Sequence, residues 1–78
     1  METMAYIQIV LDKSRERGMS PSHVAEALAT DARARKQAAM TLAEISEDLQ
    51  QRLVFIHQAK AAQEDLEGFL RVKEIAQS

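Results

Sequence analysis

The residues best suited to catalysis or metal binding in this chain of 78 residues are its two histidines, because it contains no cysteine. His23 precedes Glu26 by three residues, a spacing found in carboxylate metal sites, where it is repeated and joined by further glutamates. His57 has Leu53 four residues before it and Ala61 four residues after it, so no second ligand stands at helical spacing. A core this small also cannot enclose a substrate pocket. We therefore expect no enzymatic activity, no catalytic residue, no metal site and no cofactor.

Acidic side chains gather in two clusters in the second half of the chain, and these clusters could bind a basic surface on another protein. Their members are Glu44, Glu47 and Asp48 in the first cluster, and Glu64, Asp65 and Glu67 in the second. The alternative is a solvated helix face held by pairs at i, i+4 spacing, such as Glu67 with Arg71. With a net charge of −2, the chain as a whole does not attract nucleic acid or an anionic membrane. An unidentified protein is therefore the expected partner.

Basic side chains form one dense group in the middle of the chain, at Arg33, Arg35 and Lys36. The segment before it, residues 11–28 with the sequence LDKSRERGMSPSHVAEAL, resembles the first half of a helix-turn-helix of the Cro and phage-repressor kind. The residues that carry the resemblance are Arg17, Gly18, Met19, Ser20, Val24, Ala25 and Leu28. The resemblance implies a small DNA-binding transcriptional regulator, in which the three basic residues contact phosphates or base edges.

The match to this motif ends after residue 28. Ala29 and Thr30 stand where such a motif has a turn glycine and an apolar residue, and Arg35 and Ala38 stand where core side chains belong. A generic corner between two helices has the same signature of glycine, serine cap and helix. A generic corner is therefore the preferred interpretation, and DNA binding is the alternative.

Residues 3–17 are expected to form the first helix. Met4, Ile7 and Leu11 follow the spacing of one helical face, and Gly18 follows a basic last turn, as is typical of a helix C-terminus. The β-branched residues at 6–10 leave a short strand as the alternative. Residues 18–20 then form a turn, with Ser20 as the N-cap and Pro21 as the first residue of the next helix.

Good helix formers continue from residue 21 to residue 76 with no proline after Pro21. This region is one long helix or two. The two candidate places for a break are Thr30 and Asp31, which have N-cap chemistry, and residues 41–44, which fit the capping box T-x-x-E. Gly68 lies within an apolar pattern, so we expect the helix to continue through it, with or without a bend.

An apolar stripe with steps of three and four residues runs from residue 42 to residue 70 and predicts a coiled-coil-like seam. Residues 53–56 are apolar on every side of one turn, so they must be buried on more than one side. One helix over residues 41–76 would be about 54 Å long, more than a compact monomer can cover. We therefore expect a homodimer with an interface formed by Leu42, Ile45, Leu49, Leu53, Phe55, Ile56, Leu66, Phe69 and Leu70.

Together these patterns predict a single all-α domain over residues 1–78. A short N-terminal helix folds back on one long or broken C-terminal helix, giving a helical hairpin or coiled-coil-like dimer. The expected function is a small regulatory protein–protein interaction module, an inhibitor, anti-activator or adaptor that binds a larger protein through helical faces. A DNA-binding regulator and a purely structural assembly subunit are the alternatives. No apolar run approaches the roughly 20 residues that span a bilayer, so we expect a cytoplasmic protein with no membrane partner.

Overall fold

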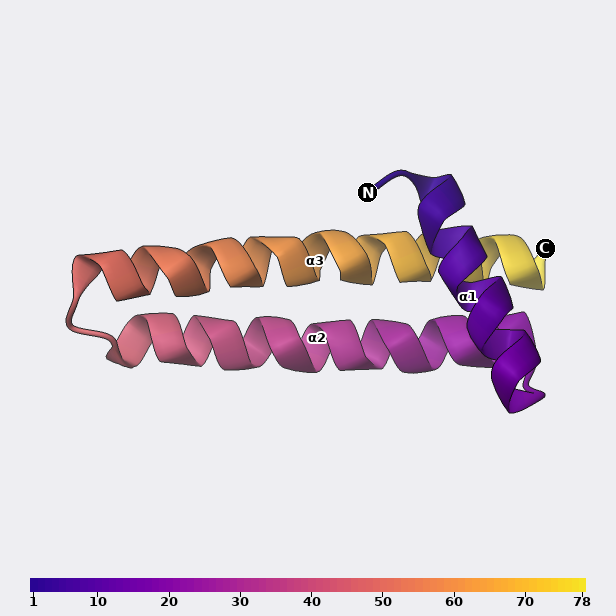
Figure 1. The fold of residues 1–78 in the computed structure, drawn as a ribbon, viewed down its shortest axis with the longest axis horizontal. Coiled ribbons are helices and arrows are strands. Elements are labelled where there is room, and N and C mark those ends of the chain that lie inside the picture. Colours follow the sequence, from indigo (N-terminus) through magenta and orange to yellow (C-terminus); the bar gives the residue numbers. More distant parts are fainter.

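The computed structural model describes all 78 residues as three α-helices: α1 (Thr3–Arg17), α2 (Pro21–Ile45) and α3 (Leu49–Gln77). Helices α2 and α3 lie antiparallel and form a hairpin, and α1 crosses the hairpin at the end opposite the α2–α3 loop (Figure 1). We call these two ends the loop end and the open end. The expected all-α fold with a short N-terminal helix is confirmed. Of the two forms considered for residues 21–76, one long helix or two, the structure has two.

Helix α1 ends at a glycine for a conformational reason. Gly18 has a φ of 64°, in the left-handed region that a residue without a Cβ adopts at little cost. The backbone N–H of Met19 then donates to the carbonyl of Ser14 at 3.2 Å, which satisfies one of the free carbonyls at the helix end. The alternative of a strand over residues 6–10 is wrong, because the whole segment is helical.

Helix α2 begins as its sequence predicts. The Ser20 hydroxyl accepts a hydrogen bond from the backbone N–H of His23 at 3.4 Å, and Pro21 occupies the first turn. The helix is 25 residues long and passes through both candidate breaks, at Thr30 and Asp31 and at residues 41–44, so neither of them is where the helical region divides. Thr41 does not cap a helix: its hydroxyl donates to the Gln37 carbonyl one turn earlier, at 3.1 Å.

The break lies instead at residues 46–48. Asp48 is the N-cap of α3, and its carboxylate accepts a hydrogen bond from the backbone N–H of Gln50 at 3.1 Å. Ser46 closes α2, because its N–H donates to the Leu42 carbonyl at 3.1 Å. The single long helix over residues 41–76 does not form. The apolar stripe is therefore divided between two antiparallel helices, with residues 42–45 on α2 and residues 49–70 on α3.

The contact between α2 and α3 is built on alanine. The α2 side of this contact buries Ala25, Ala29, Ala32, Ala39 and Ala43, at the three- and four-residue steps of one helical face. Alanine favours the helix and has a short side chain, so the two helix backbones can approach closely. This contact alone gives a thin core, since a methyl group buries little apolar area.

The larger buried side chains gather at the open end, where α1 adds a third layer. Tyr6 and Val10 of α1 pack there against Val24 of α2 and Phe69 of α3. The rings of Tyr6 and Phe69 meet edge to face, with centroids 5.1 Å apart. Gly68 lies under the Tyr6 ring, and a Cβ at this position would overlap the ring. The helix continues through Gly68, as expected. The missing Cβ leaves the space in which the Tyr6 ring of α1 packs.

Candidate interaction surface

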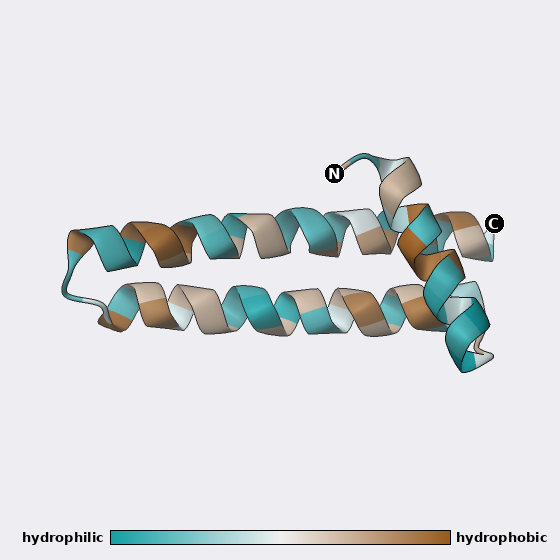
Figure 2. Cartoon of the chain, viewed as in Figure 1, coloured by the Kyte–Doolittle hydropathy of each residue, from teal (hydrophilic) through white to brown (hydrophobic).

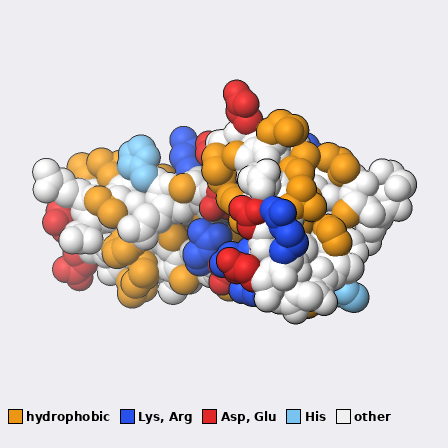
Figure 3. All heavy atoms as spheres, turned by 45° about the vertical axis from the view of Figure 1, so that its right-hand side comes forward, with side chains coloured by type: hydrophobic (Ala, Val, Ile, Leu, Met, Phe, Trp, Pro, Cys, Tyr) orange, Lys and Arg blue, Asp and Glu red, His pale blue; other side chains and the backbone are white.

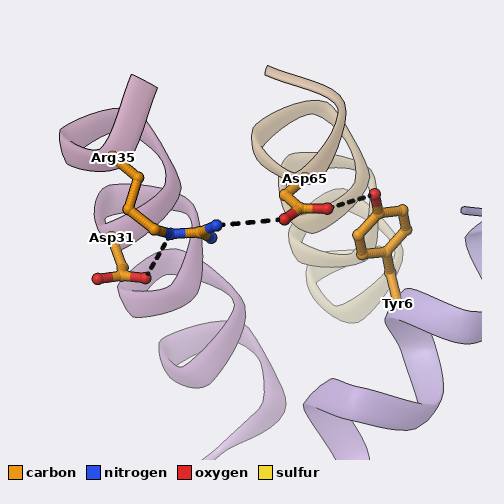
Figure 4. A network of polar contacts seen from close by, with 4 residues as sticks. All are labelled: Tyr6, Asp31, Arg35 and Asp65. Carbon is orange, nitrogen blue, oxygen red and sulfur yellow. Dashed lines mark hydrogen bonds and ion pairs between the residues drawn. The ribbon is translucent and has the colours of Figure 1, made fainter. Parts of the chain in front are cut away.

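A polar network joins the three helices beside the core (Figure 4). The Tyr6 hydroxyl donates to Asp65 Oδ1 at 2.8 Å, and Arg35 Nη1 lies 3.4 Å from Asp65 Oδ2. Arg35 Nε also donates to Asp31 Oδ2 at 3.0 Å, one turn earlier on α2. Burial, and then the hydrogen bond to Asp65, raises the pKa of Tyr6 to about 12. Tyr6 is therefore a protonated hydrogen-bond donor near neutral pH, and the network links α1, α2 and α3.

The two histidines lie far apart. His23 is in the first turn of α2, where its Nδ1 lies 3.2 Å from the Ser20 hydroxyl, and His57 is exposed on α3. Nowhere in the chain do three or more His, Asp or Glu side chains come together in a way that could hold a metal ion. Glu26, three residues after His23, lies 3.6 Å from Lys73 Nζ on α3.

The two acidic clusters stay separate in the structure. Glu44 lies on the last turns of α2 and Glu47 in the loop, while the side chain of Asp48 caps α3. In the second cluster Glu64 and Glu67 are exposed on α3. Asp65 is part of the network with Tyr6, so its carboxylate is engaged within the chain. The clusters therefore do not form one continuous acidic stripe.

The basic group lies in the middle of α2. Because α2 is continuous, the turn that a helix-turn-helix needs at residues 29–30 does not form, and no separate recognition helix carries these residues. Arg35 binds Asp31 and Asp65, and Lys36 Nζ donates to Gln63 Oε1 at 2.7 Å. Arg33 alone of the three has no ion-pair or hydrogen-bond partner within the chain.

Apolar residues lie on both helices near the loop end, where α1 does not reach (Figure 2). Large apolar side chains are exposed there (Figure 3). Each keeps between 41 % and 68 % of its surface exposed. We call this set the distal apolar surface: Met40, Leu42, Ile45, Leu49, Leu53, Val54 and Ile56. A cluster of this kind on a folded chain is typical of an interaction site.

The residues expected in a dimer interface fall into three groups. Leu42, Ile45, Leu49, Leu53 and Ile56 belong to the distal apolar surface, and Phe55 beside them is half-buried. Leu70, farther along α3, is 36 % exposed. Leu66 and Phe69 pack in the chain's own core against α1 and α2, which removes them from any surface that a second chain could contact. The predicted interface omits two members of the distal apolar surface, because Met40 lies before the stripe begins at residue 42 and Val54 lies off its three- and four-residue steps.

Two grooves between α2 and α3 are lined in part by residues of the distal apolar surface. The first, of about 360 Å³, is lined by Arg35, Ala38, Ala39, Leu42, Gln58, Ala61 and Ala62. The second, of about 340 Å³, is lined by Met40, Ala43, Glu44, Ile56, Ala59 and Lys60. We call them the α1-side groove and the far-side groove.

The names of the grooves follow from helix geometry. Arg35 and Lys36 are adjacent on α2 and diverge by about 100° around its axis. Arg35 reaches Asp65, the partner of Tyr6, and so points to the side of the hairpin that α1 covers. Lys36 reaches Gln63 on the other side. Leu42 follows Arg35 by two turns and Met40 follows Lys36 by one turn, so the two grooves lie on opposite sides of the hairpin.

Comparison with known protein families, curated proteins and solved structures found no match. None of the three helices has the length and apolar character needed to cross a membrane.

Proposed function

We propose that this chain is a small, non-enzymatic regulatory module that binds a larger protein through its helical faces. It acts as an inhibitor, anti-activator or adaptor, as a homodimer, in the cytoplasm. The observation that carries the proposal is the distal apolar surface, whose side chains have no covering layer within the chain. Water contact with so much apolar surface is unfavourable, and binding another helix removes it.

The α1-side groove is the part best suited to a helix of the partner. Its floor consists of small side chains, Ala38 and Ala39 on α2 and Ala61 and Ala62 on α3, and Leu42 stands at its edge. Helix α1 already lies on this side of the hairpin at the open end, where it inserts Tyr6 and Val10. A second amphipathic helix can lie beside it and insert apolar side chains in the same way, which is a common mode of helix recognition.

Filling this groove tests the proposal. Ala61 is exposed and lines the groove, so Ala61→Trp blocks the groove without disturbing the core. Ala34, also exposed on a helix but outside every groove, provides the matched control Ala34→Trp. Tagged wild-type and variant proteins are used to capture partners from a native lysate of the source, with and without nuclease.

We expect the wild type and Ala34→Trp to retain the same protein in stoichiometric amount after nuclease treatment, and Ala61→Trp to lose it. Equal retention by all three proteins would contradict the role of the groove. Nucleic acid as the only retained material would instead support the DNA-binding alternative. Recovery of nothing but this chain, in oligomers larger than a dimer, would support a structural assembly subunit.

A further inference from the structure

We infer that the far side of the hairpin, opposite α1, is covered by a second copy of this chain, so that two hairpins form a four-helix bundle. The inference rests on the homodimer in the proposed function and names its surface. It does not depend on the α1-side groove. Helix α1 packs across one side of the hairpin, and no helix of the chain covers the far side.

The centre of the far side is apolar. Met40 and Ala43 from α2 meet Ile56 and Ala59 from α3 around the far-side groove. Leu70 lies on the same side of α3, two seven-residue steps after Ile56, and is also partly exposed. An apolar strip thus runs along α3 on this side, interrupted once, where Gln63 accepts a hydrogen bond from Lys36.

Charged side chains border this strip, and their signs alternate. Near the loop end, Glu44 lies at the α2 edge of the groove and Lys60 at the α3 edge. Further from the loop, Arg33 lies on α2 three residues before Lys36, and Glu67 lies on α3 four residues after Gln63. The side-chain amide of Gln63 donates a hydrogen bond to the Glu67 carboxylate at 3.2 Å. The order along α2 is therefore negative then positive, and the order along α3 is positive then negative.

None of the four bordering residues forms an ion pair within the chain. The ion pairs of the structure use other residues: Lys13 with Glu16, Arg15 with Asp12, Arg35 with Asp31 and Asp65, and Lys73 with Glu26. Glu67 accepts only the neutral amide of Gln63. An apolar centre with a rim of unpaired charges is the usual anatomy of a protein interface.

A two-fold axis that runs parallel to the hairpin, beside its far side, pairs these charges between two copies. It places α2 of each copy against α3 of the other, with both loops at the same end. Glu44 then faces Lys60 of the second copy, and Arg33 faces Glu67 of the second copy. The surface is complementary to itself under this rotation, as the interface of a symmetric dimer must be.

The length of the face favours an extensive interface. The chain is 44 Å long, and α2 and α3 run side by side along most of this length (Figure 1). A stable interface buries about 800 Å² on each partner. Rotation about the parallel axis overlaps the two hairpins over their full length, which uses nearly all of this face.

The test measures the dimer dissociation constant by sedimentation equilibrium of the purified chain. Ile56 on the far side and Leu42 on the α1 side each keep 41 % of their surface exposed, so they form a matched pair. We expect Ile56→Asp to weaken the dimer at least about 100-fold, because a charge would be buried without a partner, and Leu42→Asp to leave it unchanged. Circular dichroism shows whether each variant keeps its helices. A monomeric wild type, or equal loss of the dimer in both folded variants, would overturn the inference.

Charge exchange tests the orientation. Arg33→Glu and Glu67→Arg should each weaken the dimer, and the double variant R33E/E67R should restore it. If R33E/E44R restored the dimer and R33E/E67R did not, the two hairpins would pack with their loops at opposite ends, and the proposed rotation would be overturned. Ile56→Asp that is monomeric yet still captures the partner protein supports both proposals separately. If the wild type is a dimer and Ala61→Trp captures the partner protein as well as the wild type does, only the proposed role of the α1-side groove is contradicted.

Discussion

The hydroxyl of Tyr6 on α1 donates a hydrogen bond of 2.8 Å to the carboxylate of Asp65 on α3, although 59 positions separate the two residues in the chain. Arg35 of α2 binds the other oxygen of the same carboxylate. One side chain of the predicted acidic cluster thus connects all three helices. It also fixes which side of the hairpin α1 covers, and therefore which side is left open.

Removing the Tyr6 hydroxyl should destabilise the chain modestly. In Tyr6→Phe the ring still packs against Phe69, but Asp65 loses one donor while keeping Arg35. We expect the free energy of unfolding to fall by about 1.5 to 3 kcal/mol, as is typical of a hydrogen bond to a charged acceptor. Urea denaturation followed by circular dichroism measures the change. An unchanged denaturation midpoint would show that the hydrogen bond contributes nothing to stability.

Stability should fall at alkaline pH because of the same residue. The pKa of Tyr6 rises from 10.0 to about 12 on folding, so the folded state favours the protonated phenol. This contribution is fully present below pH 10 and is lost as the pH rises toward 12, and two pKa units correspond to about 3 kcal/mol. Tyr6 is the only tyrosine, so the ultraviolet absorbance of tyrosinate reports on it directly. The matched control is Tyr6→Phe, whose stability should lack this alkaline decrease; the same decrease in both proteins would contradict the assignment.

Replacement of Gly68 by alanine should have opposite effects in two backgrounds. In the wild type, a Cβ at residue 68 overlaps the Tyr6 ring, and we expect a loss of about 1 to 3 kcal/mol from overpacking. In a Tyr6→Ala background the space is free, and Gly68→Ala should stabilise the chain by about 1 kcal/mol through helix propensity. Thermal denaturation of the four proteins in this cycle measures both effects. Destabilisation of equal size in both backgrounds would show that the Tyr6 ring is not the obstacle.

The start of α3 should depend on Asp48 and not on Thr41. Asp48→Ala removes the N-cap bond to the Gln50 N–H and should cost about 1 kcal/mol. Thr41→Ala lies inside α2, where alanine is the better helix former, so stability should stay the same or rise slightly. Chemical denaturation of the two variants under identical conditions compares them. A larger loss for Thr41→Ala would place the helix boundary at the capping box after all.

Much of the local structure could be predicted because local chemistry decides it. Gly18 ends α1 through its left-handed φ, and Ser20 and Pro21 begin α2 through a cap and a preset φ. These effects involve only a few neighbouring residues. The spacing of apolar residues along 3–17 and 21–76 likewise requires helices whatever they pack against.

The position of the break between α2 and α3 could not be predicted from the same chemistry. Residues 30–31, 41–44 and 46–48 all contain side chains able to cap a helix, so local signals do not rank them. The break at 46–48 lets the alanine row of α2 pack along α3, which is a gain that exists only after the chain folds back. Once the chain turns there, an apparently continuous stripe from Leu42 to Leu70 is divided between two antiparallel helices.

The sequence by itself therefore determined the helices, two of their ends and the excess of apolar surface over what one small chain can bury. Only the tertiary structure decided how that surface is used. Phe69 lies in the same half of the chain as Ile56, yet it is buried because α1 crosses the hairpin at its level, with Gly68 providing the space. Ile56 and Leu42 lie beyond the reach of α1 and stay exposed on opposite sides. The physical reason is that burial depends on which element arrives over a residue, and that contact spans tens of positions in the chain.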